Sequence, residues 1–210
     1  MVEEIIKDID ILRDVSKVED CVSNEEGTLL AQEMFKALAG QKTAPAIAAN
    51  QIGIQKRIIA LSVREPVYLI NPVIVSATVP VPYIESHASF PQKLFTPIRF
   101  ASIVVTADNL EGEFNFGLKG NQRNLLFKDG KINPSVLTHP VIMEAMYIQQ
   151  AVDTLNGVMP VDREAKMIEP VNVDKGPARN EIVTLTKDDA EMKIKFKKAT
   201  KFIQDGWKIK

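Results

Sequence analysis

The sequence has little of several features that mark particular protein classes. It contains one cysteine, Cys21, so no internal disulfide can form, which fits a reducing compartment. No apolar run approaches the roughly 20 residues that a membrane-spanning helix needs. The formal net charge is −1, so no overall field favours nucleic acid or an acidic membrane as a partner. These absences argue against secreted, membrane and nucleic-acid-binding proteins.

The composition that remains is that of an ordinary globular protein. Hydrophobic residues make up 45% of the 210 residues and charged residues 25%. This length is enough for one sizeable core, alone or with an appendage. The first ten residues, MVEEIIKDID, are acidic and lack the basic start and apolar stretch of a signal peptide. We therefore expect a soluble protein that is cytoplasmic or part of a particle assembled in the cytoplasm.

A first helix is predicted over residues 24–40. Ser23 and Glu26 have the spacing of a capping box, in which each side chain bonds to the backbone near the other. Apolar residues then recur every four positions, as expected of a buried helix face, at Leu30, Met34 and Leu38.

Three strands are predicted from runs of β-branched residues, at 57–61, 67–75 and 101–108. A turn is expected at Glu111–Gly112. The stretch 113–137 is polar and rich in glycine, and it is long for a segment without clear structure, which favours an insertion.

A second helix is predicted after this stretch. Thr138 is a candidate N-cap with Pro140 in the first turn, and the helix should end before Asn156–Gly157.

The end of the chain differs from the rest. Residues 164–181 contain two prolines, a glycine and several charges, so a linker is predicted between a domain at 1–163 and a small module at 182–210. The module reads as ββαβ, with apolar residues that alternate with lysines between 192 and 197. Residues 187–210 hold eight Lys against four Asp and Glu, which suits an acidic partner. A module this small should dock on something.

Three short stretches within the first domain carry a family resemblance. They are APAIAANQ (44–51), ESHAS (85–89) and QQAVDTLNG (149–157). In order and spacing they resemble the motifs G-x-G-x-A-A-x-Q, E-G-C-L-S and Q-H-E-x-D-H-L-x-G of the peptide deformylase family. Two flanking stretches, LINP (69–72) and VMPVDR (158–163), are also similar to that family. The resemblance covers roughly residues 10–163 and leaves out 113–137 and the C-terminal module.

The resemblance implies a fold and an activity. The fold would be α+β, with antiparallel and mixed sheets around a central helix. Members of the family use a divalent metal, iron or zinc, to remove the formyl group from the N-terminal methionine of new proteins. The metal is held by a cysteine of the second motif and two histidines of the third.

The residues that would do this chemistry are replaced in this chain. His87 stands for the cysteine, Gln150 and Thr154 stand for the histidines, and Ala151 stands for the glutamate that takes a proton from the metal-bound water. An amide and a hydroxyl are poor ligands for zinc or ferrous iron. We therefore expect no bound metal, no cofactor and no catalysis by the family mechanism.

The remaining site positions are expected to be vestigial. By the resemblance, Gln51 and the backbone N–H of Ala88 would form an oxyanion hole, which has no use without a nucleophile. The alternative is that Gln51 only bridges backbone groups between a strand and a loop. We expect Gln51, His87, Gln150 and Thr154 to line what is left of the pocket.

Other residues are weaker candidates for this site. His139 lies 11 positions before Gln150, or roughly 16 Å along a helix, which is too far to complete the metal site. Cys21 is a second candidate ligand. Glu85 and Arg99 are expected to form a structural ion pair.

Two classes of function stay open from the sequence. The first is a catalytically inactive deformylase-like protein that binds partners or builds an assembly, for example as a bacteriophage virion component. Its candidate partners are other protein subunits, a ribosome surface or an N-terminal peptide in a retained groove. The alternative is an active metal-dependent deformylase with a rearranged site that uses His87.

Overall fold

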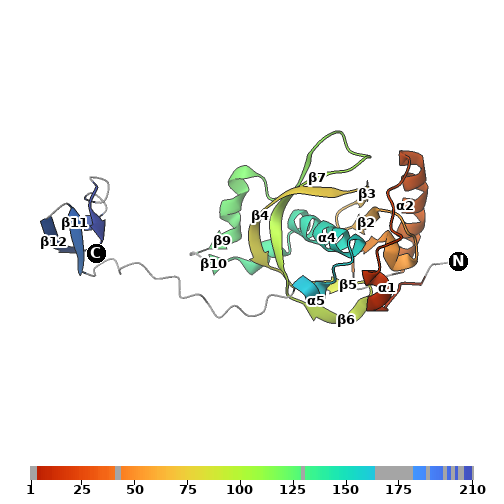
Figure 1. The fold of residues 1–210 in the computed structure, drawn as a ribbon, viewed down its shortest axis with the longest axis horizontal. Coiled ribbons are helices and arrows are strands. Elements are labelled where there is room, and N and C mark those ends of the chain that lie inside the picture. Colours follow the sequence, from red (N-terminus) through yellow and green to blue (C-terminus); the bar gives the residue numbers. More distant parts are fainter. Residues whose placement is uncertain are drawn as a thin grey trace. The chain divides into compact units, whose positions relative to one another are not determined.

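The computed structural model describes residues 4–40, 44–128, 131–163, 182–187, 190–195, 198–199, 202 and 206–209. The chain divides into two compact units, Met1–Ala165 and Lys166–Lys210. Figure 1 shows the elements of each unit. The predicted linker at 164–181 lies outside the described residues.

The first unit is built around one long helix, α4 (Pro140–Leu155). On one side of it lies the sheet β1 (Ala46–Ala48), β2 (Ile58–Ser62) and β3 (Pro66–Ile70). On the other lies the sheet β4 (Val73–Pro82), β7 (Ile98–Thr106) and β8 (Phe114–Gly117). All strand pairs within both sheets are antiparallel, and α4 contacts both sheets (Figure 1). This arrangement confirms the predicted α+β fold with a central helix.

The core explains why α4 must be almost entirely apolar or hydrogen-bonded. From Ala145 to Leu155 every side chain of α4 is buried. Ile148 and Leu155 pack in one cluster with Ile59 and Leu69 of the first sheet and Ile103 of the second. A polar side chain on such a helix costs free energy unless it finds a hydrogen-bond partner. Each polar residue of α4 therefore needs a hydrogen-bond partner within the protein.

The first predicted helix is confirmed as α2 (Asn24–Ala39), preceded by the short α1 (Ile9–Arg13). Ser23 caps α2 by accepting a hydrogen bond from the backbone N–H of Glu26 at 3.1 Å. The Glu26 carboxylate in turn accepts from the N–H of Val22 at 2.7 Å. Met34 and Leu38 are buried beneath α2, against the first sheet.

The prediction of one strand over 67–75 is wrong, because two strands, β3 and β4, meet there. Asn71 separates them with φ of +50°, a left-handed conformation that asparagine tolerates, and Pro72 lacks a backbone N–H. The Asn71 side chain accepts from the N–H of Cys21 at 2.8 Å and donates to its carbonyl at 3.0 Å. The LINP stretch thus ties the N-terminal segment to the sheet.

The interpretation of 113–137 as an irregular insertion is also wrong. Strand β8 pairs with β7, and Phe116 and Leu126 are buried in the core. Gly117 has φ of +90°, and a side chain there would overlap the carbonyl of Ala101. Short elements follow, namely η2 (Gly120–Leu126), β9 (Phe127–Lys128), β10 (Lys131–Ile132) and α3 (Pro134–Leu137). Their pattern was hidden because each is too short to show a period.

The second predicted helix is confirmed as α4, with one correction at its start. The N-cap is His139 and not Thr138: the Nδ1 atom of His139 accepts a hydrogen bond from the N–H of Val141 at 3.3 Å. Pro140 takes the first helical position, as predicted. The helix ends before Asn156, and Gly157 follows with φ of +73°.

The second unit contains a three-stranded antiparallel sheet. Strand β11 (Ile182–Lys187) lies between β12 (Ala190–Lys195) and β13 (Lys208–Ile209), so the three predicted strands are present. Residues 198, 199 and 202 are helical. A small core joins the sheet to the aromatic pair Phe202 and Trp207, whose rings meet edge-on at 6.2 Å. Lys193 and Lys195 are exposed on β12.

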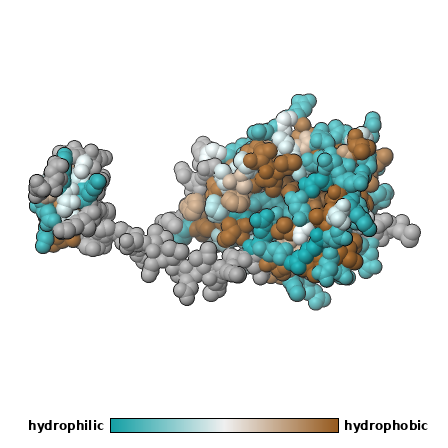
Figure 2. Space-filling view, in the orientation of Figure 1, coloured by the Kyte–Doolittle hydropathy of each residue, from teal (hydrophilic) through white to brown (hydrophobic). Residues whose placement is uncertain are grey.

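The surface of the first unit mixes apolar and polar side chains. Figure 2 shows brown apolar atoms interspersed with teal hydrophilic ones. Among the described helices, none is long and apolar enough to cross a membrane.

Candidate functional site

The residues of the three sequence motifs converge on α4. The first motif runs through β1 into the short η1 (Ala49–Ile52). The second lies on a hairpin formed by β5 (Glu85–His87) and β6 (Phe90–Phe95). The third occupies the last two turns of α4. The structure brings His87, Gln150 and Thr154 together and connects Gln51 to His87 through Ser89.

His87 is held from two sides by neutral partners. Its Nδ1 atom accepts a hydrogen bond from the N–H of Ser89 at 3.3 Å, which assigns the ring proton to Nε2. Nε2 then donates to the hydroxyl of Thr154 at 3.1 Å. That hydroxyl donates to the carbonyl of Gln150, one turn earlier, at 3.0 Å. The chain of bonds is complete and leaves neither ring nitrogen free for a metal.

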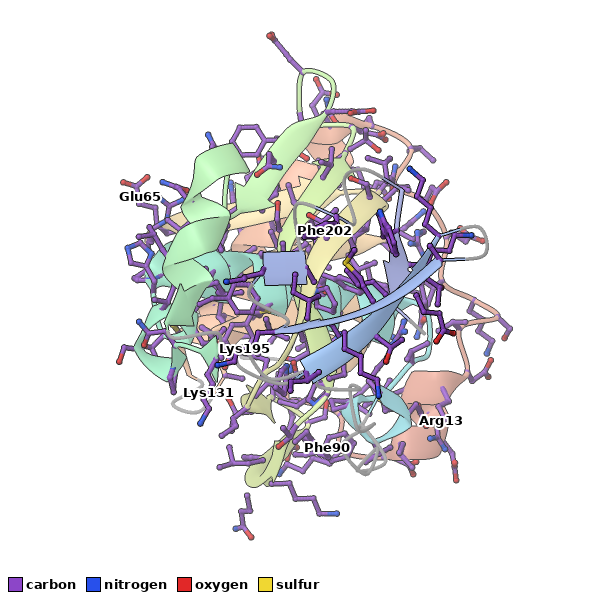
Figure 3. The ribbon with its side chains drawn as sticks, turned by 90° about the vertical axis from the view of Figure 1, so that its left-hand side faces the viewer. Arg13, Glu65, Phe90, Lys131, Lys195 and Phe202 are labelled. Atoms are coloured by element: carbon purple, nitrogen blue, oxygen red, sulfur yellow. The ribbon has the colours of Figure 1, made fainter. Side chains whose placement is uncertain are left out.

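Burial keeps the His87 ring neutral. The side chain is 1% exposed. This burial, together with the nearby charge of Arg99, lowers the pKa of His87 from 6.5 to about 4. The ring of Phe90 stacks on the imidazole with centroids 5.2 Å apart, and Phe95 packs edge-on against Phe90. Figure 3 shows Phe90 on the β5–β6 hairpin. Phe90 therefore covers His87 on one face.

Gln150 and Gln51 are also satisfied within the protein. Gln150 donates from Nε2 to the carbonyl of Ser86 at 2.9 Å. The Oε1 atom of Gln51 accepts from the N–H of Ala48 at 2.8 Å, and its Nε2 donates to the hydroxyl of Ser89 at 2.9 Å. Gln51 thus bridges the end of β1 to the loop after β5. The bridging alternative drawn from the sequence had backbone groups at both ends, whereas here the loop partner is the side-chain hydroxyl of Ser89.

The methyl side chains of Ala88 and Ala151, at two positions of the family's site, are buried and apolar. Ala88 is 2% exposed and Ala151 is 3% exposed, and both pack in hydrophobic clusters. A methyl group in the place of a carboxylate cannot take a proton from water. The site therefore lacks the general base of the family mechanism at this position.

Two features near the site were missed by sequence reasoning. Asn50 donates to the carbonyl of Thr154 at 2.9 Å, and its buried Oδ1 has no hydrogen-bond partner among the described residues. Tyr83 and Tyr147 form an edge-on pair at 6.2 Å, and burial raises the pKa of Tyr83. Tyr147 precedes Gln150 by three positions on α4. This helical spacing is the only feature of the sequence that places Tyr147 near the site.

A network of charges lies behind the hairpin. Arg99 makes two hydrogen bonds of 2.8 Å to the Glu85 carboxylate, which confirms the predicted ion pair. Its third donor, Nη1, reaches Asp153 at 2.5 Å, and Asp153 also accepts two bonds from Arg163. Burial alone would lower the pKa of Arg99, but the bonds and charges of Glu85 and Asp153 outweigh it and raise that pKa. The network joins α4 to β5 and β7.

Gln149 provides a second, neutral link between α4 and β7. Its side-chain amide accepts from the N–H of Phe100 at 2.9 Å and donates to the carbonyl of the same residue at 2.8 Å. The third motif thus retains two structural residues, Gln149 and Asp153, beside the replaced ligands. Both positions match the family motif, which explains how the helix keeps its place.

The residues present do not fit the divalent metal that the resemblance implies. Among the described residues, no three His, Cys, Asp or Glu side chains are grouped to hold a metal ion. His139 caps the start of α4, and neither it nor Cys21 belongs to such a group with His87 among the described residues. The Thr154 hydroxyl is already hydrogen-bonded to His87 and to the Gln150 carbonyl, and Gln150 offers only a neutral amide oxygen, which is a poor ligand for zinc or iron.

Comparison with known proteins decides the family. The model of the polypeptide deformylase family matches residues 2–169. The chain belongs to the polypeptide deformylase family. The match includes 113–137, which we had expected to fall outside it. No curated protein matches this chain significantly.

Solved structures show the same fold. Peptide deformylase from Thermotoga maritima is 23% identical, with a TM-score of 0.57, and the superposition covers 77% of this chain and 95% of that one. A class I type b enzyme from Acinetobacter baumannii is also 23% identical, with a TM-score of 0.58 and coverage of 78% and 99%. A deformylase from the Vibrio parahaemolyticus bacteriophage VP16T is 24% identical, with a TM-score of 0.55 and coverage of 74% and 98%. The family model ends at residue 169, so most of the second unit lies beyond it.

Proposed function

We propose that this chain is a catalytically inactive member of the polypeptide deformylase family that acts by binding. The observation that carries the proposal is the closed hydrogen-bond chain from Ser89 through His87 and Thr154 to Gln150. It uses both ring nitrogens of the one remaining candidate ligand. A metal could enter only if these bonds broke and if two further ligands were found.

The loss of chemistry is coordinated, which supports the proposal. Two ligand positions and the base position changed to Gln150, Thr154 and Ala151, and each new side chain is compatible with burial without a metal. At the same time Gln149, Asp153 and the Glu85–Arg99 pair continue to hold α4 against the sheet. The fold is retained while water activation is not.

A role in an assembly is the specific form of binding that we propose. The second unit presents Lys193 and Lys195 on an edge strand, and its core of few residues suits docking on a partner. An acidic surface on another protein subunit would complement these lysines. A virion component is one such role, and a relative of known structure comes from a bacteriophage.

Metal analysis and an activity assay test the first part of the proposal. Purified full-length protein should contain no stoichiometric zinc, iron or nickel and should not hydrolyse formyl-Met-Ala-Ser. Stoichiometric metal together with turnover would overturn the proposal and establish the alternative, an active deformylase with a rearranged site.

A restored variant tests whether the ancestral geometry survives. His87→Cys, Gln150→His, Ala151→Glu and Thr154→His together recreate the family's ligand set and base. We expect zinc binding by this variant in a titration with zinc alone. The single change Gln150→His is the matched control, because it adds one imidazole without completing the set, and it should bind no zinc stoichiometrically.

Native purification tests the assembly role. The protein isolated from its source should sediment in a complex, and the full chain with Lys193→Glu and Lys195→Glu should leave that complex. Lys36→Glu, at an exposed position of α2, places the same kind of charge reversal in the first unit and should stay associated. Sedimentation of the native protein as a free monomer would contradict this role.

A further inference from the structure

A cleft of about 360 Å³ opens on a different side of α4 from Gln150 and Thr154. Its walls come from the start of β4, from β7, from the last turn of α4 and from α5 (Pro160–Arg163). The lining residues of α4 are at 149, 152 and 153, and Asn156 directly follows the helix. At 3.6 residues per turn these positions face away from those of the candidate site. The cleft is therefore a separate feature, of a size typical of small-molecule sites.

The charges that line the cleft are mainly positive. Three guanidinium groups, those of Arg57, Arg99 and Arg163, face one carboxylate, that of Asp153. Arg99 is paired with two carboxylates, those of Glu85 and Asp153, as described above. Arg163 bonds to Asp153 through Nε and Nη2, so Glu85 and Asp153 together balance Arg99 and Arg163. The charge that these two carboxylates leave unbalanced is that of Arg57.

Arg57 has only weak compensation for its charge. Its Nη1 donates to the side-chain oxygen of Asn156 at 2.9 Å, a neutral partner. Its Nε lies 3.5 Å from Asp20, whose side chain is 71% exposed. An exposed ion pair at this distance contributes little. Because an arginine carries five N–H donors, Arg57 keeps donors for a further acceptor beyond those used in the described part of the chain.

The end of α4 does not account for these arginines. The carbonyls of the last turn of a helix need donors, and cations often supply them. Here backbone groups do so, because the N–H groups of Asn156, Gly157 and Val158 bond to the carbonyls of Val152, Asp153 and Thr154. Arg57 reaches the Asn156 side chain instead.

The remaining lining is apolar and partly open to solvent. Val73 is 53% exposed and Ile98 is 40% exposed, and Phe100 and Val152 lie beside them. An inorganic anion would use the arginines but leave these side chains in contact with water. A ligand that has both an anionic head and an apolar body would use both parts of the cleft.

We propose that this cleft binds a small organic carboxylate. The carboxylate lies between Arg57 and Arg163 and accepts charge-assisted hydrogen bonds from both. The apolar part lies over Val73 and Ile98. The proposal does not depend on whether the candidate site is inactive, because His87, Gln150 and Thr154 do not line the cleft.

Three probes separate the contributions, and each is titrated into the full-length protein by calorimetry. 4-Phenylbutyrate has both the carboxylate and an apolar body and should bind saturably. 4-Phenylbutyramide keeps the body without the charge, and inorganic phosphate is an anion without the body. Both should bind at least about tenfold more weakly, because each lacks one class of contact.

Matched variants locate the binding. Arg57→Gln and Arg163→Gln should each weaken 4-phenylbutyrate binding about tenfold. Lys36→Gln removes one positive charge from an exposed helix position away from the cleft and should leave the affinity unchanged. Backbone amide shifts of Val73, Phe100 and Asn156 in the unchanged protein should move with 4-phenylbutyrate, which keeps the test valid if a variant fails to fold. Equal binding of the amide or of phosphate, an equal loss in Lys36→Gln, or no saturable binding would overturn the proposal.

Discussion

Two polar networks meet on α4, and they differ in charge. One joins His87, Thr154 and Gln150 through neutral hydrogen bonds at the positions where the family motifs have metal ligands. The other joins Glu85, Arg99 and Asp153 through ionic hydrogen bonds on the neighbouring face. Both are buried, and they lie within one helical turn of each other on α4. The first has lost the family's residues and the second has kept them.

This difference follows from how much stability a substitution costs in each network. A metal site can be replaced by neutral groups, provided each finds a partner, because no charge is then left behind in the core. An ion pair cannot lose one member in this way, since the other is then a buried charge without compensation. The replaced positions could therefore drift to neutral side chains, whereas Arg99 remains.

The largest predicted effect comes from breaking the ionic network at its centre. Arg99→Met leaves Glu85 buried without its partner and should lower the free energy of unfolding by about 3–5 kcal/mol, or prevent folding. Chemical denaturation measures the change. The double variant Arg99→Met with Glu85→Met removes both charges and should recover part of the loss. If the double variant is less stable than the single one, the ionic interpretation is wrong.

The second prediction is that His87, in the neutral network, makes the free energy of unfolding depend on pH in the acid range. Its pKa is about 4 in the folded protein against 6.5 ordinarily, so the unfolded chain binds the proton more readily between these values. Neutral His87 therefore makes its full contribution to the free energy of unfolding above pH 6.5. As the pH falls towards 4, the free energy of unfolding should decrease by roughly 3 kcal/mol. Denaturation between pH 4 and 7 measures this slope.

The matched variants for this slope are simple, because the chain has two histidines. His87→Gln should have a smaller slope than the unchanged protein. His139→Gln, at the exposed N-cap of α4, should keep it. Identical slopes in all three proteins would show that His87 titrates alike in the folded and unfolded states.

A smaller effect is expected from one bond of the neutral network. Thr154→Val keeps the shape but removes the hydroxyl that accepts from His87, and should cost about 1–3 kcal/mol. Thermal unfolding checks the change. Thr28→Val is the control, because Thr28 makes the same hydroxyl-to-carbonyl bond within α2, to Asn24, at a half-buried position. A loss at Thr28 as large as that at Thr154 would contradict a special role for the buried network.

The smallest effect should come from an ion pair at the surface. Arg13 and Asp162 are 2.6 Å apart, but their side chains are 43% and 38% exposed. Arg13→Gln should therefore change the free energy of unfolding by less than about 1 kcal/mol, and the difference should shrink further in high salt. Figure 3 shows Arg13 on α1, at the periphery of the unit. A cost comparable to Arg99→Met would mean that charge matters here irrespective of burial.

Long periodic segments could be predicted from the sequence, and short ones could not. Capping residues and apolar residues at every third or fourth position predict helices α2 and α4, and the structure confirms both. Strand β8 has four residues, and the glycine and polar residues around it resemble a loop, so its sequence does not predict a strand. Its burial arises from pairing with β7, a contact between distant parts of the sequence.

The candidate site divides in the same way. The motif positions, the loss of the metal ligands and the Glu85–Arg99 pair could be predicted, because they depend on residue types in a known order. The bond between His87 and Thr154, and the sharing of Asp153 by Arg99 and Arg163, could not, because side chains 67, 54 and 10 positions apart meet only in the folded chain.

By itself, the sequence determined which atoms are available: neutral side chains where the family has ligands and a base, and a set of charges around Asp153. Tertiary structure alone decided how those atoms are used. Burial on all sides of α4 requires every polar group to find a partner, so His87 is tied to Thr154 and kept neutral. Where the same helix reaches the edge of the core, Arg57 and Arg163 have donors not used by the described residues, and a cleft remains open there.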